Sequence, residues 1–402
     1  MQRLKKYDTV LALTVFFLVV FGLVMITSIG VPKSISLSAP NVLYPNCSDE
    51  GVDCYLLFKK HIFRLLFGLG AFFIAWKLPL KIWFRSSKFI FLVVVLLLFI
   101  VLIMGSSFNT IAQSWLRIFD TSVQPSEIAK VGLVLYLAYW FSKKTASVSS
   151  FYDGFLPFLI ICSFVLFPVI MQNDFGSTLV LGVICLAIYV VAGANIKHLA
   201  ILTLVGFLGI FIVISAVPHV KDRFMSYLLV DQECLENSCW QSQQANIAVG
   251  SGGVLGKGLA QGVQKSYWLP QASDDFIFAA SAEELGFLRI IFIVLAYFVI
   301  AYRGFMIANN AEGKFETYVA VGITSWITIQ AFINIAVNTA LMPVTGVTLP
   351  FVSYGGSSLV TCLIGIGILL NISKSDAFYE NSTNRRGDRG ARNSQSFRYR
   401  RA

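Results

Sequence analysis

Charged residues are scarce in this chain: only 13% of its 402 residues are Asp, Glu, Lys or Arg, whereas 56% are hydrophobic. A water-soluble protein of this length could not cover so much apolar surface with so thin a charged coat. Apolar runs recur along the chain, and about 20 apolar residues of helix cross the roughly 30 Å hydrocarbon core of a bilayer. The sequence therefore predicts an all-α polytopic membrane protein.

Three other features are missing. No small-x-small cleavage site clearly follows the first apolar run, Leu11–Ile29, so we expect that run to remain as a helix rather than be removed as a signal peptide. No repeat of fixed period is visible, unlike in many transporters. No cluster of His, Cys and Asp has the spacing of a dedicated metal cage, and whether a divalent cation (Mg or Mn) assists stays open.

About ten transmembrane helices are expected, with both chain termini in the cytoplasm. The formal charge of +10 could suggest nucleic acid, but the Lys and Arg residues fall mainly on alternate loops, which is the positive-inside pattern. A large extracytoplasmic loop, residues 218–275, separates the seventh and eighth spans. The transmembrane domain covers residues 1–373, and the polar, basic residues 374–402 are predicted to be a disordered cytoplasmic tail. The predicted spans are residues 9–30, 61–78, 88–106, 126–142, 152–170, 176–192, 197–217, 276–302, 316–340 and 354–372.

Four of the seven cysteines fall as neighbouring pairs in two outer loops. These pairs are Cys47 with Cys54 and Cys234 with Cys239. Paired cysteines in an oxidising compartment usually form disulfides, so we predict a bond within each pair. Cross-pairing between the loops and unpaired thiols are the alternatives.

Placing an ionisable side chain in a membrane costs free energy, so we expect each such residue to have a structural or functional role. In QPSEIAK, Glu127 and Lys130 are three residues apart and share one face of a helix. They can hold helices together as a self-neutralising pair, or they can line a substrate cavity, which we favour. In QNDFGST, Asp174 can cap the next helix or face the same cavity.

The segment LPQASDDFIFAASAEELGF is the richest in carboxylates. Asp274 and Asp275 precede an apolar helix that carries Glu283 and Glu284 two turns further in. Solubility does not explain four carboxylates in a segment that otherwise has a membrane composition, and we do not expect all four to be structural.

The segment TGVTLPFVSYGGSS brings small residues and hydroxyl groups, including Ser353, to the start of the last span. Small residues allow helices to pack closely. Exposed N–H groups and serine hydroxyls equally suit a phosphate or a sugar. Both interpretations remain open.

Taken together, these segments resemble the SEDS family (shape, elongation, division and sporulation), which includes FtsW, RodA and SpoVE. The blocks QPSEIAK, NDFGST, SGGVLGKG, DFIFAASAEELGF and LPFVSYGGSS match the family in order and spacing, and the match extends from the first span to Asn371. The segment MPVTGVTLPF is more similar to the division (FtsW) branch than to the elongation (RodA) branch.

The resemblance implies a ten-helix bundle that polymerises lipid II into glycan strands on the outer face of the cytoplasmic membrane. It implies a class B penicillin-binding protein as partner, together with other divisome or elongasome membrane proteins. It implies that Asp275 is the essential, catalytic aspartate. It also places family positions at Trp115, Glu127, Lys130, Asp174, Arg223 and Gln241.

This reaction requires few catalytic groups. Undecaprenyl pyrophosphate is a good leaving group, so a single base for the GlcNAc 4-hydroxyl can suffice, unlike in glycoside hydrolysis. An α-linked donor and a β-linked product make the displacement inverting. Burial raises the pKa of a carboxyl group and makes it a stronger base. Cations for the pyrophosphate charge are available at Lys130, Arg223, Lys257 and Lys265.

Two departures from the family pattern affect the local loop contacts. Residues 111–115 lack the Gly and Arg that usually precede the QPSE block. Ser273 and Asp274 stand where the family commonly has His-Thr, so Asp274 competes with Asp275 for the role of base.

Two functions of other classes also fit a helical membrane protein with buried charges. One is a lipid II flippase or other transporter, and the other is a non-catalytic divisome scaffold. The binding groups of a transporter lie near the bilayer midplane. The candidate groups here gather at the outer ends of spans and in outer loops, which favours chemistry on one face.

Overall fold

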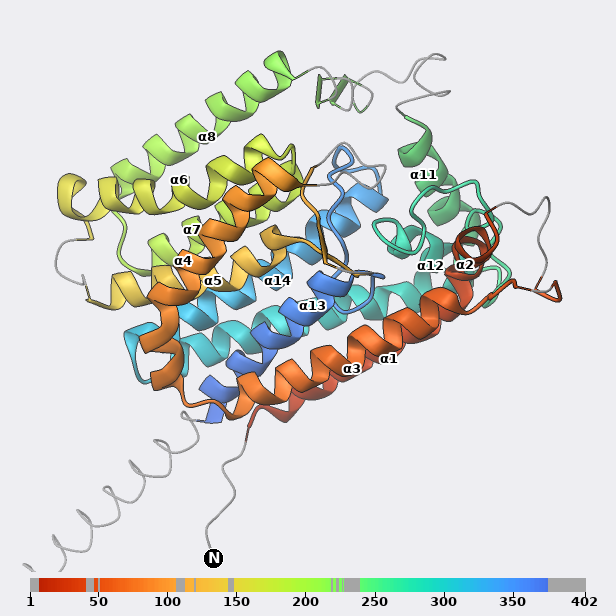
Figure 1. Ribbon diagram of the computed structural model, residues 1–402, viewed down its shortest axis with the longest axis horizontal. Helices are drawn as coiled ribbons and strands as arrows, with labels where there is room; N and C mark the ends of the chain where they lie inside the picture. The colour runs from red at the N-terminus through yellow and green to blue at the C-terminus, as the bar shows by residue number, and fades with distance from the viewer. Residues whose placement is uncertain are drawn as a thin grey trace, which may run out of the picture.

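The computed structural model describes residues 7–40, 47–49, 51–105, 113–118, 121–143, 148–217, 220–221, 224–225, 227 and 239–374. The chain folds into a bundle of helices, with α2, α11 and α12 gathered at one end (Figure 1). The helices are α1 (Thr9–Ile29), α2 (Val31–Ser38), α3 (Leu56–Lys77), α4 (Leu80–Met104), α5 (Pro125–Lys143), η1 (Phe151–Phe155), α6 (Leu156–Met171), α7 (Phe175–Val191), α8 (Ile196–Ala216), α11 (Trp240–Gly252), α12 (Ile277–Leu285), α13 (Phe287–Asn310), α14 (Lys314–Asn338) and a final helix, Gly356–Lys374.

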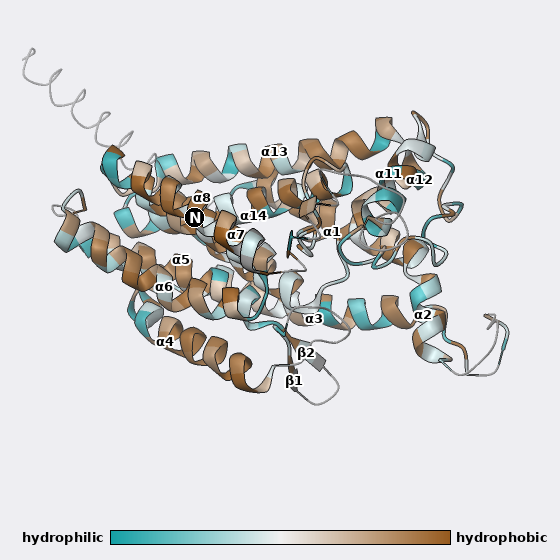
Figure 2. Cartoon of the chain, turned by 90° about the horizontal axis from the view of Figure 1, so that it is seen from above, coloured by the Kyte–Doolittle hydropathy of each residue, from teal (hydrophilic) through white to brown (hydrophobic). Residues whose placement is uncertain are grey.

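The helices have the composition of a multi-pass membrane protein. Among the residues that the structure describes, six helical segments are long and apolar enough to span a bilayer: α1, α4, η1 with α6, α13, α14 and the final helix. Every predicted span overlaps a helix, and that all ten cross the membrane stays a prediction. Apolar residues cover the outer faces of the bundle as well as its interior (Figure 2). Such an outer surface is expected for helices in contact with lipid.

The burial of the helices separates a core from a lipid-facing rim. We compare the most apolar 18-residue window of each helix. In this window 72% of the residues of the final helix and 67% of those of α14 are buried, whereas only 22% of those of α4 are buried. Helices α5 and α7 pack against α14, whereas α4 exposes large apolar side chains such as Phe89 and Ile103. The polar residues on α5 and α14 are therefore placed in the centre of the bundle.

The predicted eighth span, residues 276–302, is wrong as a single helix. It is divided into α12 and α13 at Gly286, whose φ of +76° favours glycine. A Cβ at this position would lie 2.2 Å from the backbone nitrogen of Gly256. The chain breaks here because the glycine-rich segment around Gly256 approaches the helix backbone too closely for any side chain.

Two smaller elements lie in the connections. A two-stranded antiparallel sheet precedes α5 and consists of β1 (Leu116–Ile118) and β2 (Thr121–Val123), with Leu116 opposite Val123. Within the predicted outer loop of residues 218–275, the glycine-rich part begins as α11 and continues as turns. The predicted tail lies outside the described residues from residue 375 onward.

Candidate active site

A row of polar side chains on α14 organises the centre of the bundle. Trp326, Gln330, Asn334 and Asn338 follow one another at intervals of four residues, which places them on one face of the helix. All four are at most 1% exposed. Because a buried amide is costly unless it is hydrogen-bonded, each of these side chains requires a partner, and those partners define the site.

Lys130 and Glu127 form a buried ion pair at the inner end of this row. The Lys130 Nζ atom lies 2.6 Å from Glu127 Oε1 and also donates to Gln330 Oε1 at 2.8 Å. The indole of Trp326 donates to the same amide oxygen at 2.7 Å. Lys130 is 0% exposed, so its charge is neutralised inside the bundle rather than in water. The predicted pair is therefore present and faces the interior.

Asp174 both caps a helix and joins this polar centre. One carboxylate oxygen accepts from the backbone N–H of Ser177, at 3.0 Å, in the first turn of α7. The other accepts from Gln124 Nε2 at 2.9 Å and from Ser126 Oγ at 3.0 Å. Since Ser126 precedes Glu127, the QPSE and NDFGST blocks meet here. The helix cap predicted for Asp174 is confirmed, and its position in a substrate cavity stays a prediction.

The segment after α14 runs along its polar face. Gln330 Nε2 donates to the carbonyl oxygen of Thr348 at 3.1 Å, and Asn334 Nδ2 donates to that of Val347 at 2.7 Å. The hydroxyl of Ser357 accepts from the backbone N–H of Gln124 at 3.0 Å. The TGVTLPFVSYGGSS and QPSEIAK blocks are thus in direct contact.

Asp275 lies at the Asn338 end of the same network. Its backbone carbonyl accepts from Asn334 Nδ2 at 2.7 Å and from Asn338 Nδ2 at 2.9 Å. Its carboxylate, which is partly exposed, approaches Gly346, where Oδ2 lies 3.8 Å from the position that a Cβ would occupy. The main chain of Asp275 is therefore anchored on the bundle core, while its carboxylate lies beside a glycine turn.

Asp274 has different surroundings. Its carboxylate forms an ion pair with Lys33 of α2 and accepts from Ser273 Oγ at 2.9 Å. Its carbonyl accepts from the buried Ser353 hydroxyl at 2.6 Å. Ser353 thus holds the backbone beside the candidate base, and a contact of its hydroxyl with the substrate stays a prediction. The Asp274 carboxylate thus has two partners in the described part of the chain, and Asp275 as the base stays a prediction.

The expectation that not all four carboxylates are structural stays a prediction that depends on Asp275, whereas Glu283 and Glu284 are structural. Both are 0% exposed. Glu283 accepts from Lys257 Nζ at 2.6 Å and from the backbone N–H groups of Val263 and Gln264 at 3.1 and 3.0 Å.

Glu284 accepts from Lys265 Nζ at 2.6 Å, from the backbone N–H of Ala260 at 3.1 Å and from the hydroxyl of Ser28. The two glutamates therefore hold the glycine-rich segment against α12. Lys257 and Lys265 are each paired with a buried carboxylate, and their contact with a pyrophosphate stays a prediction.

The remaining predicted residues are less central. Trp115 is half-buried next to β1, and Gln241 is half-buried in the first turn of α11. Arg223 lies outside the described residues. A disulfide joins Cys47 to Cys54, the first predicted pair, with a Cα–Cα distance of 5.7 Å. Cys239 is also disulfide-bonded, and its predicted partner Cys234 lies outside the described residues.

Sequence reasoning missed the amides Gln330, Asn334 and Asn338, and it also missed Arg64. The amides carry a signal, since three of them at intervals of four residues in an apolar span indicate a buried polar face. The Arg64 guanidinium lies 4.7 Å from the centre of the Tyr354 ring and packs against Gly356. Within the described residues Arg64 forms no ion pair. No group of three or more His, Cys, Asp or Glu residues there could hold a metal ion.

Comparison with known proteins identifies the fold and the family. The FtsW, RodA and SpoVE family model, described as "Cell cycle protein", matches residues 8–377. The "Probable peptidoglycan glycosyltransferase FtsW" of Geobacter sulfurreducens is 33% identical over 373 residues, which cover 92% of this chain and 96% of that protein. The "Stage V sporulation protein E" of Bacillus subtilis is 38% identical over 323 residues, which cover 80% of this chain and 88% of that protein.

A solved structure of a peptidoglycan synthase complex contains a chain with the same fold. The TM-score is 0.72 at 24% sequence identity, and the match covers 92% of this chain and 98% of that chain. The sequence-based resemblance is confirmed, and the chain belongs to the FtsW/RodA/SpoVE family of cell cycle proteins.

Proposed function

We propose that this chain is a peptidoglycan glycosyltransferase that polymerises lipid II into glycan strands on the outer face of the cytoplasmic membrane. The activity in the name of the Geobacter relative supports this, because the similarity extends over 92% of the chain. The single observation that carries the proposal is Asp275, a partly exposed carboxylate at the edge of a buried polar network. Its fixed backbone suits a group that must meet a reacting atom at a defined position.

In the proposed reaction, Asp275 acts as the general base. It takes the proton of the acceptor GlcNAc 4-hydroxyl while that oxygen attacks the anomeric carbon of the donor MurNAc. The new C–O bond forms as the bond to the pyrophosphate breaks, and undecaprenyl pyrophosphate leaves with the electron pair. A single displacement of this kind inverts the anomeric centre, and general-base catalysis of this type contributes about 10²- to 10⁴-fold.

We assign the cation that faces the leaving group to Arg64. Its half-buried guanidinium lies over Tyr354 beside the glycine pair Gly355–Gly356. Guanidinium groups bind phosphate oxygens through two parallel N–H donors. In contrast, Lys130, Lys257 and Lys265 are already neutralised by glutamates. If a divalent cation assists, it would neutralise the charge that develops on the pyrophosphate of the substrate, because the described residues contain no group of three or more His, Cys, Asp or Glu residues that could hold it alone.

The proposed partner is a class B penicillin-binding protein, which would crosslink the strands that this chain makes. The matching fold within a peptidoglycan synthase complex supports such an assembly. The names of the curated relatives favour a role in the division branch. The proposed orientation has both termini in the cytoplasm, so a cytoplasm-specific reporter fused after His219, which lies outside the described residues, should be inactive.

The decisive experiment uses the purified chain with lipid II, both alone and together with its partner. Polymeric glycan is the expected product. Translocated but unpolymerised lipid would identify a flippase, and neither product would identify a scaffold. The polar groups favour the first outcome, because Asp275 lies two residues before α12, which is gathered with α2 and α11 at one end of the bundle (Figure 1).

A further inference from the structure

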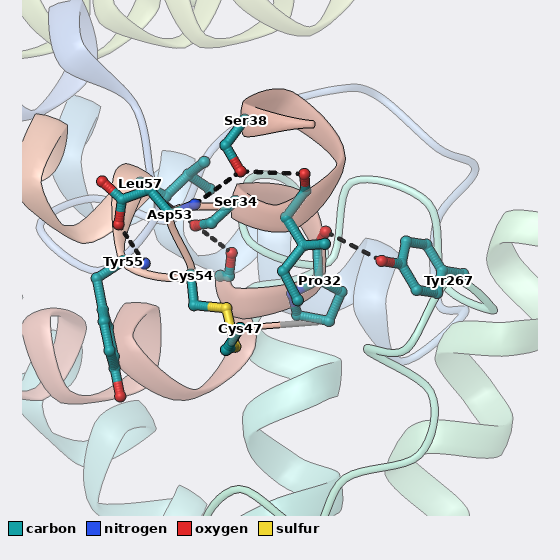
Figure 3. The surroundings of a disulfide bond; sticks show 11 residues. Pro32, Ser34, Ser38, Cys47, Asp53, Cys54, Tyr55, Leu57 and Tyr267 are labelled. Atoms are coloured by element: carbon teal, nitrogen blue, oxygen red, sulfur yellow. Dashed lines mark hydrogen bonds between the residues drawn. A yellow bond between two sulfur atoms is a disulfide. The ribbon is translucent and has the colours of Figure 1, made fainter. Parts of the chain in front are cut away.

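The short helix α2 is attached firmly to the start of α3. The Ser34 hydroxyl accepts from the backbone N–H of Leu57 at 3.1 Å, and the Ser38 hydroxyl accepts from that of Asp53 at 3.0 Å. The Cys47–Cys54 disulfide closes the connection beside these contacts (Figure 3). Because two hydroxyls and a covalent link hold it, α2 is a fixed platform rather than a loose loop.

This platform contacts the segment that leads to Asp275. The Tyr267 hydroxyl donates to the backbone carbonyl of Pro32 at 3.4 Å (Figure 3). The next residue, Lys33, donates to Gln271 Oε1 at 2.9 Å and forms the ion pair with Asp274. Tyr267 and Gln271 both have positive φ values, +70° and +54°. Since residues other than glycine adopt such angles only when their surroundings impose them, these contacts hold a strained segment in place.

Lys33 has a special position in this arrangement. Within the described part of the chain it is the only residue from another segment that hydrogen-bonds to the Asp274 carboxylate. The neighbouring backbone carbonyls accept hydrogen bonds from the bundle. The Ser353 hydroxyl donates to the carbonyl of Asp274, and Asn334 Nδ2 donates to the carbonyl of Asp275. Lys33 therefore supplies the contact that comes from the outer side.

We propose that Lys33 is a positioning residue that sets the Asp275 carboxylate by holding its neighbour Asp274. The inference rests on the proposed function, in which Asp275 is the base. If Lys33 is lost, Asp274 and Gln271 are released on the outer side, and the adjacent carboxylate loses its defined position. A misplacement of about 1 Å can cost about 100-fold in rate.

The test compares Lys33→Met with Lys33→Arg in the full chain with lipid II. We expect Lys33→Met to lower kcat about 10- to 100-fold with little change in KM, and Lys33→Arg to restore most of the rate. The thermal midpoint should stay unchanged, because a partly exposed ion pair contributes little to stability. A merely structural role would instead lower the midpoint and leave the kcat of the folded protein intact.

Lys59→Met is the matched control. Lys59 also pairs with an aspartate of the outer segment, Asp53, at 2.8 Å, and its hydrogen bond lowers the pKa of that carboxyl group. This pair is more exposed than the Lys33–Asp274 pair, and its ion pair does not include a residue of the Gln271–Asp275 segment, so we expect the activity of the parent.

A double-mutant cycle tests whether Lys33 acts through Asp274. We expect the double variant Lys33→Met/Asp274→Asn to have a kcat no lower than that of the slower single variant, because both substitutions break the same contact. Hydrogen exchange of the peptide 271–276 should rise in Lys33→Met and not in Lys59→Met. Three results would each overturn the inference: fully additive effects on kcat in the double variant, a kcat of Lys33→Met equal to that of the parent, or unchanged hydrogen exchange in Lys33→Met. A parent protein that makes no glycan would instead overturn the proposed function, and the exchange measurement would still decide whether Lys33 holds the segment.

Discussion

The ammonium of Lys130 lies 2.6 Å from Glu127 Oε1 at a site where Lys130 has no exposure to solvent. The second oxygen of Glu127, Oε2, is buried and has no hydrogen-bond partner among the described residues. The carboxylate is thus neutralised mainly by one lysine. Because the desolvation cost of each charge is offset by the other, the two side chains depend on each other.

We predict that Glu127→Gln and Lys130→Gln will each destabilise the protein by about 3–5 kcal/mol, since each leaves one buried charge unpaired. The double variant should recover a large part of this loss, because no charge remains. The check is thermal unfolding in detergent together with glycan synthesis. Single variants as stable and active as the parent would show that the pair is an incidental contact.

A second prediction concerns the glycine-rich segment. Glu284→Gln should destabilise the protein by about 3–5 kcal/mol, because it leaves the buried Lys265 ammonium without its counter-charge. The segment around Ala260 should also become sensitive to protease, since its backbone N–H bonds to Glu284. The exposed Glu312 provides the control, and Glu312→Gln should change neither property. Equal stability of the two variants would show that Glu284 does not hold this segment.

The helices and the Glu127–Lys130 pair could be predicted because local patterns encode them. Apolar runs specify helices that face lipid, and a spacing of three residues places opposite charges on one helix face. The break at Gly286 could not be predicted in this way. It depends on the close approach of Gly256, thirty residues earlier, and no local pattern records that contact.

The roles of the carboxylates show the same limit. Composition and spacing do not distinguish Asp274 from Asp275, and no local pattern predicts the ion pair of Asp274 with Lys33, which is far away in the chain. Glu283 and Glu284 resembled site residues because buried carboxylates are costly. Their partners are backbone N–H groups of a glycine-rich segment, which have no side-chain signature.

A third prediction tests the cation assigned to the leaving group. Arg64→Gln should lower the rate of glycan synthesis about 100-fold, on the order of the loss of one donor to a developing negative charge. Arg64→Lys should retain part of the rate, because it keeps the charge but loses the planar pair of donors.

Lys60→Gln is the control for Arg64, since Lys60 is exposed on the same helix one turn earlier. Its rate should match that of the parent. If Arg64→Gln also matches the parent, another cation faces the pyrophosphate, and Arg223 is then the next residue to test.

The last prediction separates the two neighbouring aspartates. Asp275→Asn keeps the size of the side chain but removes the base, so polymerisation should fall by about two to four orders of magnitude while lipid II still binds. The hydrogen bonds from Asn334 and Asn338 end on the backbone carbonyl of this residue, so the substitution leaves both of these contacts in place. Asp274→Asn removes only the charge that Lys33 holds, and its loss should be much milder. The measurement is single-turnover polymer formation beside a lipid II binding assay. A fully active Asp275→Asn variant beside an inactive Asp274→Asn variant would reassign the base to Asp274, and two fully active variants would eliminate a mechanism that depends on one carboxylate.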